Sequence, residues 1–198
     1  MMFPVLIFSI SLLFNTVLFA EERNEEKEIV VVAVGAIDRY VMDWLKDDLN
    51  KVFGKQVLIG KGMPEPDFSY HKKRNQYLST SILRTILEQK EFAPYEKILG
   101  ILDHDLYVPQ LNFVFEEAST KAAVISLTRL RQSFYKLPEG QELFRKRILT
   151  EAVHELGHTF GLGHCENPRC VMFFSNSLMD TDRKGFEFCL RCGGKFKL

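Results

Sequence analysis

One short motif near the C-terminal end constrains this chain more than any other feature. The eleven residues from His154 to His164 read HELGHTFGLGH, which is the pattern H-E-x-x-H-x-x-G-x-x-H. On a helix, His154 and His158 lie one turn apart on the same face, with Glu155 beside them. Because Gly161 can adopt a positive φ, it can end the helix and turn His164 back toward the other two imidazoles. We therefore expect a helix that ends in a glycine turn and gathers three histidines.

Three neutral imidazoles form a typical site for a divalent metal. Histidine nitrogens bind zinc at about 2.0 to 2.1 Å, and three protein ligands leave a fourth position for water, as in catalytic sites. Zinc lowers the pKa of such a water toward ~7, and Glu155 is suited to accept its proton as general base. At ordinary residue frequencies this pattern arises by chance in only about one chain in 10⁵. The other two histidines, His71 and His104, are isolated and are expected to be ordinary polar residues.

All four cysteines of the chain follow this motif closely, at Cys165, Cys170, Cys189 and Cys192. They form two short pairs, C-x4-C and C-x-x-C, separated by a loop. Such paired spacing favours a tetrahedral four-thiolate zinc site. In an oxidising compartment the same residues could form two disulfides instead.

Taken together, these motifs resemble the archaemetzincins, a branch of the metzincin zinc peptidases. The resemblance rests on the three-histidine motif, the cysteine directly after it, Met172 and the closing C-x-x-C. The segments 103–118 and 122–130 also look like the strands around the active site of this family. The resemblance covers most of residues 97–192.

Membership in this family would assign a role to each motif residue. The resemblance implies a catalytic zinc bound by His154, His158 and His164. Glu155 would be the general base, and Met172 would lie in the turn beneath the metal. A second, structural zinc would be held by Cys165, Cys170, Cys189 and Cys192, so that each chain carries two ions. The implied activity is zinc-dependent hydrolysis of peptide bonds.

The order of apolar patterns along the chain predicts an α/β fold. Strands are expected at residues 28–34, 56–60, 97–102, 111–115 and 122–127. Helices are expected at residues 38–53, at 71–90, and from about 138 to 161. Strand, helix, strand, helix and then further strands place helices on both sheet faces. We expect a metzincin-like twisted mixed sheet with about three helices and a small, irregular, cysteine-containing C-terminal part.

The first twenty residues differ in character from the rest. Residues 1–20 contain no charged side chain, and charge begins at Glu21. This is typical of a secretory signal peptide cleaved after Ala20, or of an N-terminal membrane anchor. We therefore expect an exported or membrane-tethered protein, or a cytoplasmic one if translation starts further downstream. The metallopeptidase domain would then be residues 21–198, with the catalytic turn and four-cysteine segment at 165–192.

The charge balance narrows the range of partners. The chain has 26 Lys and Arg against 26 Asp and Glu, which is not the basic excess of a nucleic-acid-binding protein. We expect a peptide or protein substrate, no nucleic acid, and membrane contact only through an uncleaved N-terminal segment.

An extended peptide substrate would lie against a sheet edge. Leu111–Phe115 is the candidate edge, with an internal strand as the alternative. The sequence gives no indication of oligomeric state.

Two other functions are compatible with the metal motifs. A catalytically silent zinc-binding protein could act as an interaction module, but the intact Glu155 argues against it. A zinc ribbon that binds nucleic acid through the cysteines is disfavoured by the zero net charge.

The sequence does not identify the carboxylates that would orient the histidines; Asp103, Asp105 and Asp180 are candidates.

Overall fold

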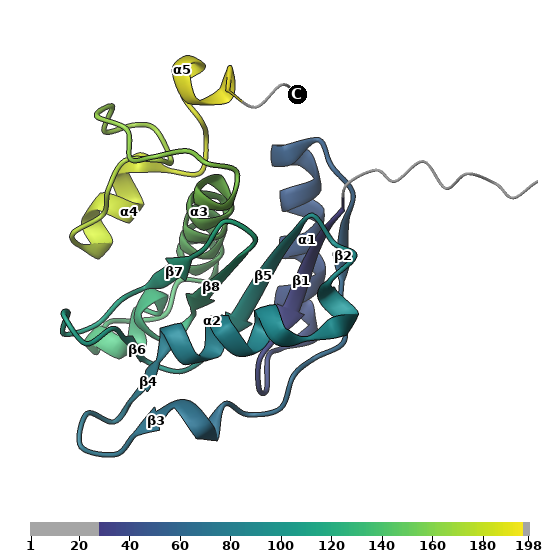
Figure 1. Ribbon diagram of the computed structural model, residues 1–198. Coiled ribbons are helices and arrows are strands. Elements are labelled where there is room, and N and C mark those ends of the chain that lie inside the picture. Colours follow the sequence, from purple (N-terminus) through teal and green to yellow (C-terminus); the bar gives the residue numbers. More distant parts are fainter. Residues whose placement is uncertain (1–27, 196–198) are drawn as a thin grey trace, which may run out of the picture.

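The computed structural model describes residues 28–195, and a five-stranded sheet forms its centre (Figure 1). The strand order is β2-β1-β5-β8-β7. Their bounds are Ile29–Ala33 (β1), Val57–Ile59 (β2), Lys97–Leu102 (β5), Glu116–Ala118 (β7) and Ala122–Ser126 (β8). The strands β2, β1, β5 and β8 are parallel, whereas β7 runs antiparallel to β8 at the edge. The sheet is therefore mixed, as predicted.

Helices cover both faces of this sheet. Figure 1 shows α1 (Arg39–Phe53) and α3 (Gln141–Thr159) on one face and α2 (Ser79–Glu88) on the other. Alternate residues of β1 point to opposite sides, so that Val31 packs with the α1 and α3 core and Val30 with the α2 core. Short 3₁₀ turns lie at Asp67–Ser69, Lys90–Phe92, Thr128–Leu130 and Ser133–Tyr135.

The α1 helix follows its sequence signals closely. The side chain of Asp38 accepts a hydrogen bond from the Tyr40 N–H at 2.8 Å, which caps the first turn. At the other end Gly54 takes a φ of 59°, and its N–H bonds the Asn50 carbonyl. The predicted helix at residues 38–53 is confirmed.

The helix predicted at residues 71–90 is wrong in its first half. That half instead contributes two short strands, β3 (Tyr70–His71) and β4 (Gln76–Leu78). Together with β6 (Leu106–Tyr107) they form a small second sheet. A tight turn with Asn75 at a φ of 52° reverses the chain between β3 and β4. The Gln76 side chain then bonds Asp105 at 3.1 Å and the Asn112 carbonyl at 2.9 Å. These contacts with distant residues outweigh the local helical pattern.

No regular strand forms over the predicted segment Leu111–Phe115, where Val114 makes only an isolated bridge to Leu106. The Arg74 guanidinium instead donates to the carbonyls of Leu111 and Asn112 at 2.8 and 3.0 Å. A side chain therefore occupies acceptors that a strand ladder would use. The edge strand β7 begins one residue beyond the predicted segment.

The C-terminal part is irregular except for two short helices, α4 (Leu178–Lys184) and α5 (Leu190–Gly193). The described residues thus contain five α-helices rather than about three. The α4 helix is fixed to α3 by the Arg147 guanidinium, which contacts the Asp182 carboxylate at 2.7 Å.

The predicted leader at residues 1–20 lies outside the described part of the chain. Within residues 28–195, the helices are all too short or too polar to cross a lipid bilayer.

Candidate active site

The three motif histidines meet at the C-terminal end of α3. Ligand atoms of His154, His158 and His164 lie within 4.8 Å of one another. The Nε2 atoms of His154 and His158 are 3.0 Å apart. Two nitrogens bound to one tetrahedral zinc would lie about 3.3 Å apart. The predicted trio is therefore brought together at a spacing that suits a metal ion.

Backbone carbonyls fix the orientation of two of these rings. The Nδ1 of His154 lies 2.7 Å from the Val171 carbonyl, and the Nδ1 of His158 lies 2.8 Å from the Leu162 carbonyl. Because a carbonyl can only accept, a proton on each Nδ1 satisfies it and leaves a lone pair on each Nε2; the Lys184 ammonium also lies 3.2 Å from the His154 Nδ1. Two lone pairs that face each other at 3.0 Å repel unless a cation lies between them. This donor set fits a zinc ion.

The surroundings also keep the imidazoles neutral. Burial, followed by the Lys184 ammonium, lowers the pKa of His154 well below its usual range. Burial likewise lowers the pKa of His158 and of His164. Since only a neutral imidazole can bind a metal, this environment favours the binding form at neutral pH.

The turn to the third histidine depends on Gly161. Its φ is 83°, a conformation that other residues rarely adopt. The Gly161 N–H bonds the His158 carbonyl at 2.9 Å, and the Leu162 N–H bonds the Gly157 carbonyl at 3.0 Å. The helix therefore ends sharply, as the motif predicted, and His164 follows the turn.

Met172 lies directly against the motif helix and is fully buried. A Cβ atom added at Gly157 would lie 2.5 Å from the Met172 sulfur. The second x of H-E-x-x-H is therefore a glycine because a side chain would collide with this methionine. The Met172 carbonyl also accepts from the Cys165 N–H at 2.8 Å, which links it to the cysteine segment.

Glu155 belongs to a buried group of charged side chains that the sequence did not reveal. Its carboxylate is 3.8 Å from the His154 Nε2 and is 4% exposed. Glu151 lies one turn earlier on α3, and Glu116 reaches the same region from β7. Lys184, at the end of α4, lies 3.5 Å from Glu151, and both side chains are fully buried. Only the four-residue spacing of the two glutamates on α3 could have indicated this group.

The charges in this group also favour a bound cation. Burial, followed by the Glu151 carboxylate, raises the pKa of Glu155 well above its usual range. Burial and the same neighbour raise the pKa of Glu116. Both carboxylate oxygens of Glu151 lack a hydrogen-bond partner among the described residues. One ammonium thus faces three carboxyl groups, and a dication at the histidines would help to balance them.

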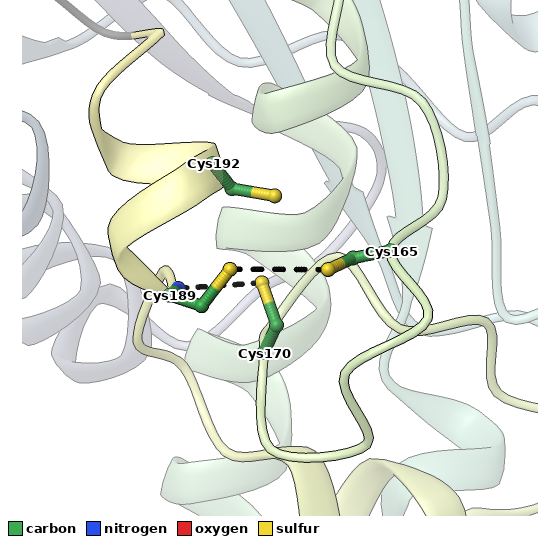
Figure 2. A group of neighbouring side chains, drawn as sticks. All are labelled: Cys165, Cys170, Cys189 and Cys192. Carbon is green, nitrogen blue, oxygen red and sulfur yellow. Dashed lines mark hydrogen bonds between the residues drawn. The ribbon is translucent and has the colours of Figure 1, made fainter.

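The four cysteines gather just beyond His164, where Figure 2 shows their side chains converging from the 165–170 loop and from α5. Their sulfurs lie within 4.8 Å of one another, and those of Cys165 and Cys189 are 3.8 Å apart. A tetrahedral zinc with Zn–S bonds of about 2.3 Å separates its sulfurs by about 3.8 Å. All four thiols are free, without a disulfide. This arrangement fits a zinc ion better than a pair of disulfides.

The thiols differ in acidity. The N–H of Cys192 lowers the pKa of Cys189 to about 6, whereas burial raises the pKa of Cys192 to about 12. The Arg191 guanidinium donates to the Cys165 sulfur at 3.4 Å. Hydrogen bonds to sulfur of this kind are typical around thiolate ligands.

A cleft of about 410 Å³ opens beside the histidines. Residues 111–116 line one wall, and residues 174–176 line the other. The ring of Phe174 lies 4.8 Å from that of His164 and is about half exposed. Leu111 and Phe113 face the same space, so the cleft is largely apolar, and Phe174 places one end of it beside His164.

The carboxylates considered as orienting groups have other roles. Asp103 pairs with Arg131 at 2.6 Å, and Asp105 pairs with Arg129. Asp180 lies in the first turn of α4, where it bonds Ser177. The backbone carbonyls of Val171 and Leu162 orient two of the histidines instead. Because every residue has a carbonyl, the sequence does not show which ones take this role.

The isolated histidines are polar surface residues. His104 pairs with Glu65 at 2.6 Å, and the ring of His71 lies against that of Tyr107. Neither belongs to a group of possible metal ligands among the described residues.

Comparison with known proteins agrees with this arrangement. The family model described as peptidase family M54 matches residues 63–198. An archaemetzincin from Methanocaldococcus jannaschii is 40% identical over 166 residues, which cover 83% of this chain and 89% of that protein. The crystal structure of archaemetzincin from Methanopyrus kandleri superposes with a TM-score of 0.76 at 36% identity, covering 88% of this chain and 96% of that one. A zinc-dependent peptidase from Methanocorpusculum labreanum gives a TM-score of 0.77 at 29% identity, covering 85% and 100%.

The fold, the cluster of three histidines and these relatives define a zinc metallopeptidase. The chain belongs to peptidase family M54, and the resemblance to archaemetzincins inferred from its motifs is confirmed.

Proposed function

We propose that this protein hydrolyses peptide bonds at the three-histidine centre, with Glu155 as general base. A zinc ion held by His154, His158 and His164 would activate water and polarise the scissile carbonyl. Glu155 accepts a proton from the attacking water and passes it to the leaving amine. The observation that carries this proposal is the close approach of the His154 and His158 Nε2 atoms, 3.0 Å apart, beside a buried carboxylate.

The substitution Glu155→Gln tests this role. It removes the base but keeps the side-chain volume, so peptide hydrolysis should fall by about 10² to 10⁴-fold while zinc content stays unchanged. Glu142→Gln, an exposed position in the first turn of the same helix, is the control. If Glu155→Gln cleaves peptides as fast as the wild type, the assignment of the base is wrong. A wild type that binds zinc but cleaves no peptide in a diverse library would support the silent interaction module.

A second zinc on the four cysteines completes the proposed metal content. The 3.8 Å separation of two sulfurs and the four free thiols support it. Metal analysis of the purified protein should find two zinc ions per chain. One zinc together with no titratable thiols after denaturation would instead favour two disulfides.

The substrate would lie along β7, with an apolar side chain in the neighbouring cleft. The antiparallel edge position of β7 supports strand addition, and Phe113 and Phe174 supply apolar walls. In a peptide library, sites with a large apolar residue next to the cleaved bond should be preferred. A preference for charged residues at that position would contradict this placement.

Residues 1–20 would export the protein or tether it to a membrane. Their uncharged, apolar composition supports this role. Mass spectrometry of the protein isolated from fractionated cells should find either a chain beginning at Glu21 outside the cytoplasm or a full-length chain in the membrane fraction. A full-length chain in the cytoplasm would contradict the proposal.

A further inference from the structure

Lys97 joins three parts of the molecule that meet beside the active-site helix. Its backbone begins the central strand β5 and pairs with Ile29 of β1. Its ammonium donates to the Thr159 carbonyl at 2.7 Å and to the Thr120 carbonyl at 2.8 Å. It also lies 4.8 Å from the centre of the Phe160 ring. The base of this side chain is therefore rigid, and its charged end holds two other segments.

The contact with Thr159 stabilises the end of the motif helix. Thr159 is the last residue of α3 and directly follows His158. A cation near the last carbonyls of a helix supplies a hydrogen bond and a favourable interaction with the helix dipole. The chain then turns at Gly161 to deliver His164. Lys97 therefore holds the short segment that sets the position of the third imidazole relative to the second.

The contact with Phe160 holds the next residue of the same segment. Phe160 lies between the motif helix and Gly161, and its ring packs on that of Phe53 at 5.7 Å. An ammonium above an aromatic ring is attracted to the face of that ring. The Lys97 contacts with Thr159 and Phe160 together restrain both residues that precede the glycine turn.

The contact with Thr120 reaches the substrate side of the site. Thr120 lies in the turn between β7 and β8, and β7 is the edge strand beside the cleft. One ammonium group thus fixes the metal-binding helix and the strand hairpin relative to each other. We propose that Lys97 is a positioning residue that holds the turn between His158 and His164, and thereby the geometry of the three-histidine metal site. This inference rests on the proposed function of that site.

The test compares Lys97→Met and Lys97→Arg with Lys121→Met. Methionine keeps the length of the side chain without its charge, and arginine restores a cation. Lys121 is the matched control, because its ammonium donates to the Ala93 carbonyl at 2.7 Å, away from α3. The readout is cobalt binding in the full chain with the cysteine site filled by zinc, followed by the visible bands of the histidine-bound cobalt. Thermal unfolding of each variant is measured in parallel.

Lys97→Met should weaken cobalt binding at the histidines by about 10 to 100-fold and alter its bands, the range typical for residues that orient metal ligands. Lys97→Arg should restore most of the affinity, and Lys121→Met should leave it unchanged. If Lys97→Met lowers the unfolding temperature but the folded protein binds cobalt with wild-type affinity and bands, the inference is overturned. If the wild type itself binds no cobalt at the histidines, the proposed function of the site is wrong; this result differs from one in which Lys97→Met binds cobalt as the wild type does. Should Lys97→Met not fold, wild-type bands and affinity in a folded Lys97→Gln variant would overturn the inference equally.

Discussion

The three-histidine site and the four-cysteine site are joined by one peptide bond, between His164 and Cys165, yet they are built in different ways. Two of the histidines, His154 and His158, lie on a 19-residue helix that packs against the central sheet, and backbone carbonyls orient both of their rings. The cysteines lie on a loop and a four-residue helix. The first site is therefore built mainly on a long helix, whereas the second is built on short, irregular segments that pack against the same core.

This difference predicts unequal effects of losing one ligand. Cys170→Ser should destabilise the zinc-loaded protein by more than about 4 kcal/mol, because loss of a structural metal removes much of the local folding free energy. With the histidine site free of metal, His158→Ala should cost only about 1 kcal/mol, the value of its hydrogen bond to Leu162. Urea unfolding of both variants measures the two losses. If both variants lost the same free energy of unfolding, the cysteine site would not be the more important of the two for stability.

The second expected difference between the two sites is in how their metal affinity changes with pH. Each thiol that must lose a proton makes apparent affinity fall tenfold per pH unit. With the pKa of Cys189 at about 6, at most three thiols are protonated near neutral pH. The affinity of the cysteine site should therefore fall by up to about three decades from pH 8 to 7.

Over the same interval the histidine site should change little, since burial lowers the pKa of its imidazoles and they are already neutral. Its affinity falls only when the pH drops through those lowered values. Cobalt competition with a chelator measures both curves, because thiolate-to-cobalt bands mark the cysteine site. If the metal affinities of the two sites fell in parallel with pH, this expected difference between the sites would be contradicted.

The smallest expected effect concerns Met172, which contacts both sites. Gly157→Ala would place a methyl group 2.5 Å from the Met172 sulfur. Overpacking of this kind costs about 1 to 3 kcal/mol. Gly163→Ala is the control, because a Cβ there meets nothing within 4 Å. Thermal unfolding compares the two variants, and equal stability would show that the contact with Met172 relaxes freely.

Local sequence signals predicted the parts of the molecule that local interactions determine. The caps at Asp38 and Gly54 marked α1, and the run KILGIL gave the bounds of β5 at Lys97–Leu102. The motif spacing likewise predicted that His154, His158 and His164 converge. In each case the interacting groups lie within a few turns of one another, so their periodicity is visible in the chain.

Contacts between distant segments explain what the sequence did not predict. The hairpin that replaces the first half of the second helix is held by residues about thirty positions away, such as Asp105. Glu116 and Lys184 join the buried charges of the active site from β7 and α4. The groups that orient the histidines are main-chain carbonyls, which every residue type carries. None of these features leaves a local pattern in residue type.

Access to solvent is graded across the three imidazoles. His154 is 2% exposed, His158 is half-buried and His164 is exposed. An arriving ion would meet His164 first and settle inward, and a departing ion would break its bond to His154 last. In the proposed metal site, an ion would thus enter and leave past His164, the residue that follows the glycine turn.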